Sequence, residues 1–305
     1  MEKVLITGAS GLLGTRLTEL LLAKGYSVNT LGRGGQQTAQ NSVQHFAWNV
    51  LSGTIDKRAL EGVTAVIHLA GAGIADQRWS KKRKLEVIES RVKGARLIFD
   101  HLQTTQHTVA TFISASAVGY YGDCGNTIVN EEHKQGEGFL AEVCWLWEEA
   151  AKIFRQLNIR EVRCRIGIVL AKDGGALPEL TRTIPFGFAN WFAKEDLYYP
   201  WIHLDDVCGI FIHALESKQV AGAYNASAPS PLLMKDLMKE ILKARNSKAL
   251  LLPAPPSAIN LVLGEMSQMV LNSQRCSAAK IMATGYRFKY GEIKDALANI
   301  YVMSS

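Results

Sequence analysis

The stretch VLITGASGLLG, residues 4–14, points to one particular supersecondary unit near the start of the chain. Its first three residues form a short apolar run typical of a buried strand, and glycines follow at positions 8, 11 and 14. Residues 15–24 are rich in leucine and predict a helix. A strand, a glycine turn and a helix N-terminus together attract anions, because backbone N–H groups and the helix dipole both favour negative charge there.

Each glycine of this turn has a distinct predicted task. Gly8 permits the tight turn, Gly11 lets a pyrophosphate approach the backbone, and Gly14 lets the helix pack against the strand. A strand–turn–helix unit with a purely structural role is the alternative. We expect a dinucleotide to bind at the turn, through Gly8, Ser10, Gly11, Leu12, Leu13 and Gly14.

The end of the next predicted strand bears on the choice of cofactor. Residues 27–31 are followed by Gly32 and Arg33, and no carboxylate occurs at this strand end. NAD-binding folds usually carry an acid here, about 20 residues past the glycines, which accepts from the ribose 2′-hydroxyl. Arg33 instead offers a planar fork of donors that suits a 2′-phosphate. The sequence therefore favours NADP(H), with a surface arginine in a turn as the alternative.

Composition excludes several other classes of protein. The 305 residues are 48% hydrophobic, and no apolar run is long enough to cross a bilayer. The first strand begins almost at once, so we expect no signal peptide. Five cysteines are scattered without a CxxC pair, which is typical of reduced thiols in a cytoplasmic protein. We expect no membrane association and no metal site.

The net charge of +6 raises the question of nucleic-acid binding. The positive charge is spread along the chain, and its one local run, residues 81–84, opens a predicted helix and indicates a solvated face. An excess of positive charge also suits an anionic cofactor. We therefore expect no nucleic-acid partner. A small-molecule substrate is expected, and the oligomeric state is left open, with a homodimer as one option.

Strands and helices alternate along the first part of the chain. This alternation predicts an α/β fold, a doubly wound Rossmann-type parallel sheet. Ligands in such sheets bind beyond the carboxyl ends of the strands. Further strands are expected at 45–48, 65–69, 111–114 and 162–170, and the longest helices at 85–102 and 140–157.

After about residue 175 the alternation weakens. We expect an NADP-binding domain over 1–175, with its sheet completed by parts of 200–228. A smaller substrate lobe is expected over 176–305 and includes a C-terminal segment at about 250–300.

Four motifs together resemble those of the extended short-chain dehydrogenases/reductases, the superfamily of the NAD-dependent epimerases and dehydratases. They are TGASGLLG at 7–14, HLAG at 68–71, SASAVGYYG at 114–122 and WIHLDD at 201–206. A closer likeness is to one branch, the epimerase-family proteins of undetermined reaction. Its hallmarks include Arg78-Trp79, Ser90-Arg91-Val92, RIGIVL at 165–170 and TGYRF at 284–288.

One feature departs from that branch. The branch usually has a glycine-rich stretch before its WIH segment, where this chain has an aromatic one over 186–199. The substrate pocket is therefore expected to differ. By resemblance, further cofactor contacts fall on Leu69, Ala70, Gly71, Arg91 and Ser114.

The usual acid–base pair of the superfamily is missing. The resemblance implies a Tyr-x-x-x-Lys pair about 25 residues beyond the strand-end serine, yet residues 139–149 contain no tyrosine and no lysine. Tyr290 and Lys294 have the right spacing but lie far along the chain, and we attribute this to chance. The residues left as catalytic candidates are Ser116, Tyr121 and His203.

Each candidate has an alternative. Ser116 hydrogen-bonds a substrate carbonyl or packs at the strand end. The position that aligns with the superfamily's catalytic serine is either Ser116 or the next residue, Ala117. The phenol comes from Tyr121 or from its neighbour Tyr120. His203, whose ordinary pKa is near neutrality, acts as an acid–base group or as a structural histidine.

Three functions therefore remain open. The first is an NADP(H)-dependent oxidoreductase or nucleotide-sugar epimerase-like enzyme with unusual proton transfer. The second is a redox sensor or regulatory protein that binds NADP(H) without turning it over. The third is an interaction protein that keeps the nucleotide for stability.

Overall fold

The computed structural model describes residues 2–33, 39–40 and 43–302. The chain divides into two compact units. Unit 1 comprises 1–116, 143–164 and 208–223, and unit 2 comprises 117–142, 165–207 and 224–305. The division does not fall at residue 175, because 117–142 and 165–175 make most of their contacts within unit 2.

A mostly parallel sheet forms the framework of unit 1. Strand β1 pairs in parallel with β2 on one side and β6 on the other, and β7 extends the sheet beyond β6. The strand order is β15-β9-β7-β6-β1-β2-β4-β3, with β5 paired to β4. This order confirms the predicted doubly wound Rossmann-type fold. The strands are β1 (Lys3–Thr7), β2 (Ser27–Gly32), β3 (Ala39–Gln40), β4 (Val43–Asn49), β5 (Thr54–Ile55), β6 (Ala65–His68), β7 (Thr111–Ala117), β9 (Arg160–Ile166) and β15 (Gly222–Ala226).

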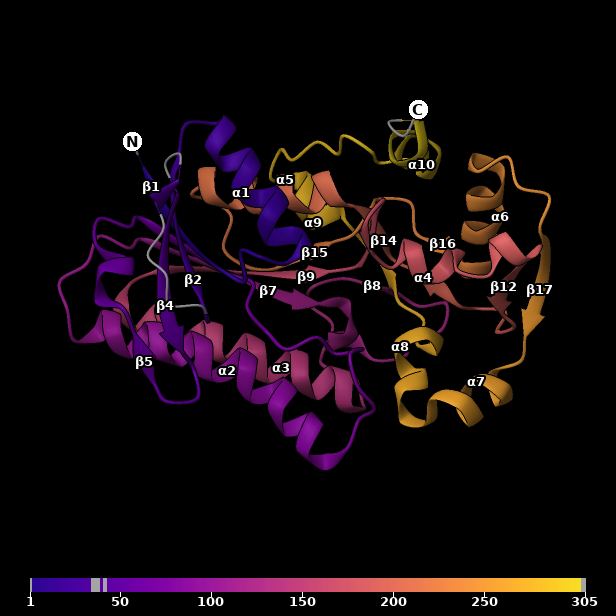
Figure 1. Ribbon diagram of the computed structural model, residues 1–305, viewed down its shortest axis with the longest axis horizontal. Coiled ribbons are helices and arrows are strands. Elements are labelled where there is room, and N and C mark those ends of the chain that lie inside the picture. Colours follow the sequence, from indigo (N-terminus) through magenta and orange to yellow (C-terminus); the bar gives the residue numbers. More distant parts are fainter. Residues whose placement is uncertain (1, 34–38, 41–42, 303–305) are drawn as a thin grey trace. The chain divides into compact units, whose positions relative to one another are not determined.

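Helices cover both faces of this sheet (Figure 1). On one face, α2 and α3 enclose a core in which the ring of Phe154 contacts those of Phe99 and Phe112. On the other face, Leu17 and Leu21 of α1 are fully buried. The elements are α1 (Leu12–Ala23), α2 (Lys81–Gln103), α3 (Phe139–Lys152) and α5 (Leu204–Glu216), with 3-10 turns η1 (Lys57–Leu60) and η3 (Ile153–Leu157).

One predicted strand is wrong in extent. The sequence suggested a single strand over 162–170, whereas β9 ends at Ile166 and a separate strand, β10 (Ile168–Ala171), joins a different sheet. Gly167 makes this break. A Cβ at Gly167 would lie 2.0 Å from the carbonyl oxygen of Pro200, so only glycine lets the two backbones approach there.

Unit 2 is built from small sheets and short helices around its own core. Strand β10 pairs with β11 and β14, β12 with β17, β13 with β16, and β8 with β18. The fully buried Trp201 lies at the centre of this core with Leu237 and Leu297. The elements are β8 (Ile128–Val129), β11 (Gly174–Gly175), β12 (Phe188–Phe192), β13 (Tyr198–Tyr199), β14 (Trp201–His203), β16 (Leu232–Leu233), β17 (Leu250–Ala254), β18 (Arg275–Cys276), α4 (Leu177–Thr181), α6 (Met234–Ala244), α7 (Pro256–Leu263), α8 (Gln268–Leu271), α9 (Ala279–Ala283), α10 (Ile293–Val302), η2 (Val118–Tyr121), η4 (Ile184–Phe186) and η5 (Gly264–Ser267).

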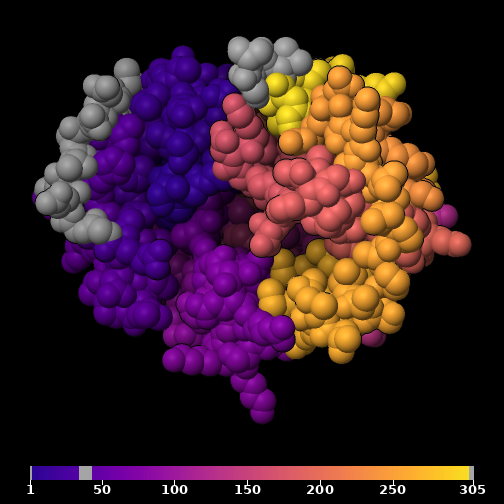
Figure 2. All heavy atoms as spheres, turned by 45° about the vertical axis from the view of Figure 1, so that its right-hand side comes forward, coloured from indigo at the N-terminus to yellow at the C-terminus, as the bar shows by residue number. Residues whose placement is uncertain are grey.

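The segment around α7 contributes surface rather than core. Helix α7 contains no buried residue, and Leu261 is 87% exposed. The orange region of Figure 2 shows this part of the chain on the visible face. Among the described residues, no helix combines the length and the apolar character that a membrane span requires.

Candidate functional site

The glycine turn after β1 is closely packed where the sequence requires it. Gly8 has φ +72°, and a Cβ there would lie 2.9 Å from the amide nitrogen of Ala70. A Cβ at Gly14 would lie 2.3 Å from the carbonyl oxygen of Gly8. A Cβ at Gly11, in contrast, meets nothing nearer than 3.4 Å. Gly8 and Gly14 thus close the turn, whereas a side chain at Gly11 would fit at ordinary contact distance.

The N-terminus of α1 is ready for an anion. Its N-cap residue Gly11 provides no side-chain hydrogen bond, and the first turn contains no acidic residue. Ser10 and Gly11 are exposed, while Leu12 and Leu13 are half-buried. The first amides of a helix lack intrahelical acceptors, so they remain available to a phosphate. The residues present therefore fit the pyrophosphate of a dinucleotide.

Arg33 directly follows β2, the strand next to β1. Its side chain is exposed, and it has no hydrogen-bond or ion-pair partner within the described ranges. Strand β2 contains no acidic residue that would repel a phosphate. The guanidinium is therefore available at the strand end where the ribose of a dinucleotide binds in this fold.

A buried network joins the HLAG segment to the first strand. The hydroxyl of Thr7 lies 2.8 Å from Nδ1 of His68 and accepts a hydrogen bond from the backbone N–H of Ala70 at 3.2 Å. His68 is fully buried, and burial lowers its pKa to about 4. The imidazole is therefore neutral near pH 7. It positions the loop after β6 against the glycine turn and adds no charge there.

Arg91 lies directly beneath that loop. It is 9% exposed, and its Nη1 donates to the carbonyl oxygens of Ala72 at 3.0 Å and Val87 at 2.9 Å. A Cβ at Gly71 would be 3.1 Å from the Arg91 Cζ, and the ring of Trp147 lies 4.8 Å from the guanidinium carbon. Burial lowers the pKa of the guanidinium. Arg91 thus supports the loop that contains Leu69, Ala70 and Gly71.

Ser116 is the strand-end candidate of unit 1. It is 1% exposed, and its hydroxyl donates to Oε1 of Glu148 on α3 at 2.9 Å. The other Glu148 oxygen accepts from Arg163, which is also paired with Glu161. The Ser116 hydroxyl therefore completes a buried charge network. Ser114, paired in register with His68, donates to the carbonyl oxygen of Ala115.

Tyr121 belongs to unit 2 and has a comparable internal role. Its hydroxyl donates to Oδ1 of Asn225 at 2.7 Å and accepts from Nη1 of Arg165 at 2.9 Å. Burial raises the pKa of this phenol well above its ordinary value of 10. The neighbouring Tyr120 is half-buried, and the Arg165 guanidinium carbon lies 3.6 Å from its ring centroid. Within the described chain, no group hydrogen-bonds the Tyr120 hydroxyl.

His203 ends β14 and is also held from within unit 2. Its Nδ1 accepts from the backbone N–H of Asp205 at 3.1 Å, it hydrogen-bonds with Asn299, and its ring packs 4.1 Å from that of Tyr290. Burial lowers its pKa, although Asp205 and Asp206 partly offset this. The geometry favours the structural interpretation of His203. Within unit 2, His203 and Tyr121 have separate sets of partners.

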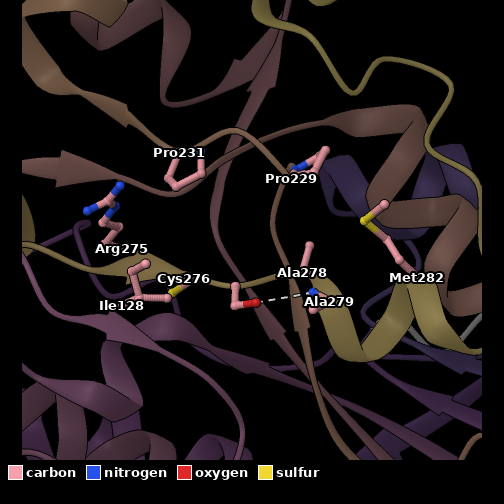
Figure 3. Close-up of a pocket in the computed structure, with 9 residues that line it drawn as sticks. Ile128, Pro229, Pro231, Arg275, Cys276, Ala278, Ala279 and Met282 are labelled. Atoms are coloured by element: carbon pink, nitrogen blue, oxygen red, sulfur yellow. Dashed lines mark hydrogen bonds between the residues drawn. The ribbon is translucent and has the colours of Figure 1, made fainter.

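A cavity of about 300 Å³ opens beside β18 (Figure 3). Pro229, Pro231 and Met282 give it apolar walls, and Arg275 adds a cation at one end. The Arg275 guanidinium is already bonded to Asn126. The volume of this cavity is at the lower limit for a small-molecule site. The described residues contain no cluster of His, Cys, Asp or Glu that could hold a metal ion.

Several residues of these networks were not predicted from the sequence. Glu148 and Arg163 carry no motif signal of their own, and the motif that begins at Thr7 does not indicate its bond to His68, because these contacts join residues that are distant in sequence. The side chain of Arg83, on the same helix as Arg91, donates to the carbonyl oxygen of Gly73 at 2.5 Å. The one sequence signal for these contacts was the presence of both Arg83 and Arg91 in α2, where both side chains are buried.

Comparison with known proteins agrees with this geometry. The model of the NAD dependent epimerase/dehydratase family matches residues 4–139, and that of a domain of unknown function, DUF1731, matches 254–300. The chain is 30% identical to epimerase family protein YfhF of Bacillus subtilis over 298 residues, which cover 97% of each protein. The chain belongs to the epimerase family. This confirms the resemblance drawn from its motifs.

Two further relatives place it more closely within the epimerase family. The chloroplastic homolog of epimerase family protein SDR39U1 from Arabidopsis thaliana is 32% identical, over 97% of this chain and 86% of that protein. The crystal structure of human epimerase family protein SDR39U1 with NADPH superposes with a TM-score of 0.86 at 27% identity, covering 98% of each chain. That human protein was crystallised with NADPH, the form of the cofactor that the sequence analysis predicts for this chain.

Proposed function

We propose that this epimerase-family protein binds NADP(H) at the carboxyl edge of the unit 1 sheet. The observation that carries the proposal is the combination of an uncapped helix N-terminus at Gly11 with an exposed, acid-free strand end at Arg33. The first holds the pyrophosphate, and the second holds the 2′-phosphate. The NADPH in the human SDR39U1 structure supports the same cofactor.

Affinity measurements test this assignment. Replacement Arg33→Ala removes charge-assisted hydrogen bonds of about 1.5–3 kcal/mol, so NADPH affinity should fall about tenfold or more. NADH affinity should stay the same, because NADH lacks the 2′-phosphate. Arg16→Ala, which removes a surface arginine paired with Glu19 in the same unit, is the matched control. Unchanged NADPH binding in Arg33→Ala contradicts the assignment.

The proposed activity is that of an oxidoreductase or a nucleotide-sugar epimerase-like enzyme acting on a small molecule. The nicotinamide, when bound, supplies or accepts a hydride. The protein must then provide a proton donor or acceptor. We assign this role to Tyr120 rather than Tyr121, since the Tyr120 hydroxyl has no hydrogen-bond partner in the part of the chain described. The Tyr121 hydroxyl, by contrast, already donates to Asn225 and accepts from Arg165.

Adjacent tyrosines make a sharp test. In a screen of carbonyl compounds and sugar nucleotides, followed by NADPH absorbance and product analysis, Tyr120→Phe should lose turnover while still binding NADPH. Tyr121→Phe should chiefly lose stability, because it leaves Asn225 and Arg165 with a missing partner. Full turnover in Tyr120→Phe excludes the assignment.

A second candidate function is NADP(H) binding without turnover, for regulation through a partner. The specific observation in its favour is that Ser116 and His203 are both bonded internally, to Glu148 and to Asp205. Helix α3 also contains no tyrosine, so its Lys152 has no tyrosine four residues before it to form the pair that the superfamily uses. Tight NADPH binding with no turnover on any substrate of the screen, in wild type, favours this function over the enzyme.

A further inference from the structure

Arg91 is a buried cation with no acidic partner among the described residues. Its side chain is 9% exposed, its Nη1 donates only to backbone carbonyl groups, and its buried Nε has no hydrogen-bond partner. A guanidinium removed from water normally lies against a carboxylate, because an unpaired buried charge is strongly unfavourable. Arg91 therefore places a positive charge beneath the loop, and no acid is paired with it among the described residues.

Arg83 provides the contrast within the same helix. It is 6% exposed, and its Nε also has no partner. Its Nη1, however, lies 2.9 Å from Glu86 and its Nη2 lies 3.5 Å from Asp76. Two arginines of α2 are therefore equally buried, but only the charge of Arg83 is neutralised by acids.

Arg91 lies near the carboxyl edge of the unit 1 sheet, where the cofactor is proposed to bind. The guanidinium lies beneath Gly71, and the preceding Ala70 packs against Gly8 of the phosphate turn. His68, at the end of β6 beside this loop, is neutral near pH 7, because burial lowers its pKa to about 4. Arg83 on the same helix adds a further positive charge, and Cys144 is the other titratable group that acts on Arg91. The charge of Arg91 is thus not opposed by an ionised neighbour on β6.

We infer that Arg91 makes the protein hold NADPH in preference to NADP⁺. This rests on the proposed NADP(H) binding and adds a determinant of redox form to it. The two forms carry the same phosphates and differ by one positive charge on the nicotinamide ring. Attraction of Arg91 to the phosphates therefore cancels between them. Repulsion of the oxidised ring does not cancel, since Coulomb energy falls only inversely with distance in a poorly solvated region.

Calorimetric titration of both cofactor forms at low ionic strength tests the inference. The wild type should bind NADPH more tightly than NADP⁺. Arg91→Met, which removes the charge, should bring the ratio of the two dissociation constants at least about threefold closer to one. Arg91→Lys should keep the wild-type ratio, because it keeps the charge. Arg96→Met, a control on the same helix, should also keep it, because this arginine is 57% exposed and solvent screens its charge.

Each outcome decides the matter. A merely structural role for Arg91 weakens both forms equally, so an unchanged ratio in Arg91→Met overturns the inference. Equal affinities in the wild type overturn it as well, and this measurement holds even where Arg91→Met does not fold. If the wild type binds neither form, the proposed function fails instead, and the two failures are therefore distinguishable.

Discussion

Two glycines of the phosphate turn should separate cofactor binding from folding. Gly11 and Gly14 are three residues apart in the same turn, yet their surroundings differ. A Cβ at Gly14 would stand 2.3 Å from the Gly8 carbonyl oxygen and 2.6 Å from the Ala9 Cα, both of which are backbone atoms. A Cβ at Gly11 has 3.4 Å to its nearest neighbour, at the limit of ordinary contact.

The magnitudes follow from these distances. Gly14→Ala forces backbone to move, so we expect overpacking to cost about 1–3 kcal/mol of unfolding free energy. Gly11 has φ −80° and ψ 168°, a conformation that alanine adopts freely. Gly11→Ala weakens the N-cap but also reduces the entropy of the unfolded chain, so its stability should change by less than about 1 kcal/mol.

For Gly11→Ala, NADPH affinity should change more than the free energy of unfolding does. Its new methyl group projects where the pyrophosphate approaches the backbone, so NADPH affinity should fall by about tenfold, equivalent to 1.4 kcal/mol. Urea unfolding of the free protein measures stability, and calorimetric titration with NADPH measures affinity. Wild-type affinity in Gly11→Ala would refute the approach of the pyrophosphate to Gly11, and wild-type stability in Gly14→Ala would refute the close packing of the turn at Gly14.

Two further predictions concern buried titratable groups. Because burial depresses the pKa of His68 from 6.5 to about 4, the unfolded state binds the extra proton first. Stability should therefore fall by up to about 3 kcal/mol as the pH drops from 6.5 to 4, and His68→Gln should flatten that slope in urea unfolding. The carboxylate of Asp206 is 1% exposed and accepts from the Tyr286 hydroxyl and two backbone amides. Asp206→Ala should lower the free energy of unfolding by about 3 kcal/mol or more. The control Asp236→Ala, at a carboxylate that is 47% exposed, should change it by less than about 0.5 kcal/mol. Equal changes in the two variants would contradict a stabilising role for the buried carboxylate.

The fold was predictable because its signals are local in sequence. The predicted strands at 4–6, 27–31 and 65–69 coincide within two residues with β1, β2 and β6, since apolar runs flanked by turn residues need no distant partner to be recognised. The extent of the sixth strand was not predictable in this way. Its break at Gly167 depends on the approach of Pro200, 33 residues farther along the chain.

The roles of the catalytic candidates also depend on contacts that are distant in sequence. Ser116, Tyr121 and His203 all stand in segments that resemble motifs of the superfamily, SASAVGYYG and WIHLDD. Their hydrogen bonds, however, run to Glu148, 32 residues away, to Asn225, 104 residues away, and to other groups of the fold. A motif indicates which side chains are present, but it does not indicate whether their polar atoms are already engaged.

The sequence by itself determined the phosphate turn, the absence of an acid beside Arg33 and the loss of the tyrosine–lysine pair, because each is a property of contiguous residues. Tertiary structure alone decided which of two adjacent tyrosines keeps an available hydroxyl, and which of the two buried arginines on α2 has no acidic partner. The burial and the hydrogen-bond partners of a side chain are set by residues that only folding brings together. These two properties control the pKa of a polar group and whether it is available to a ligand.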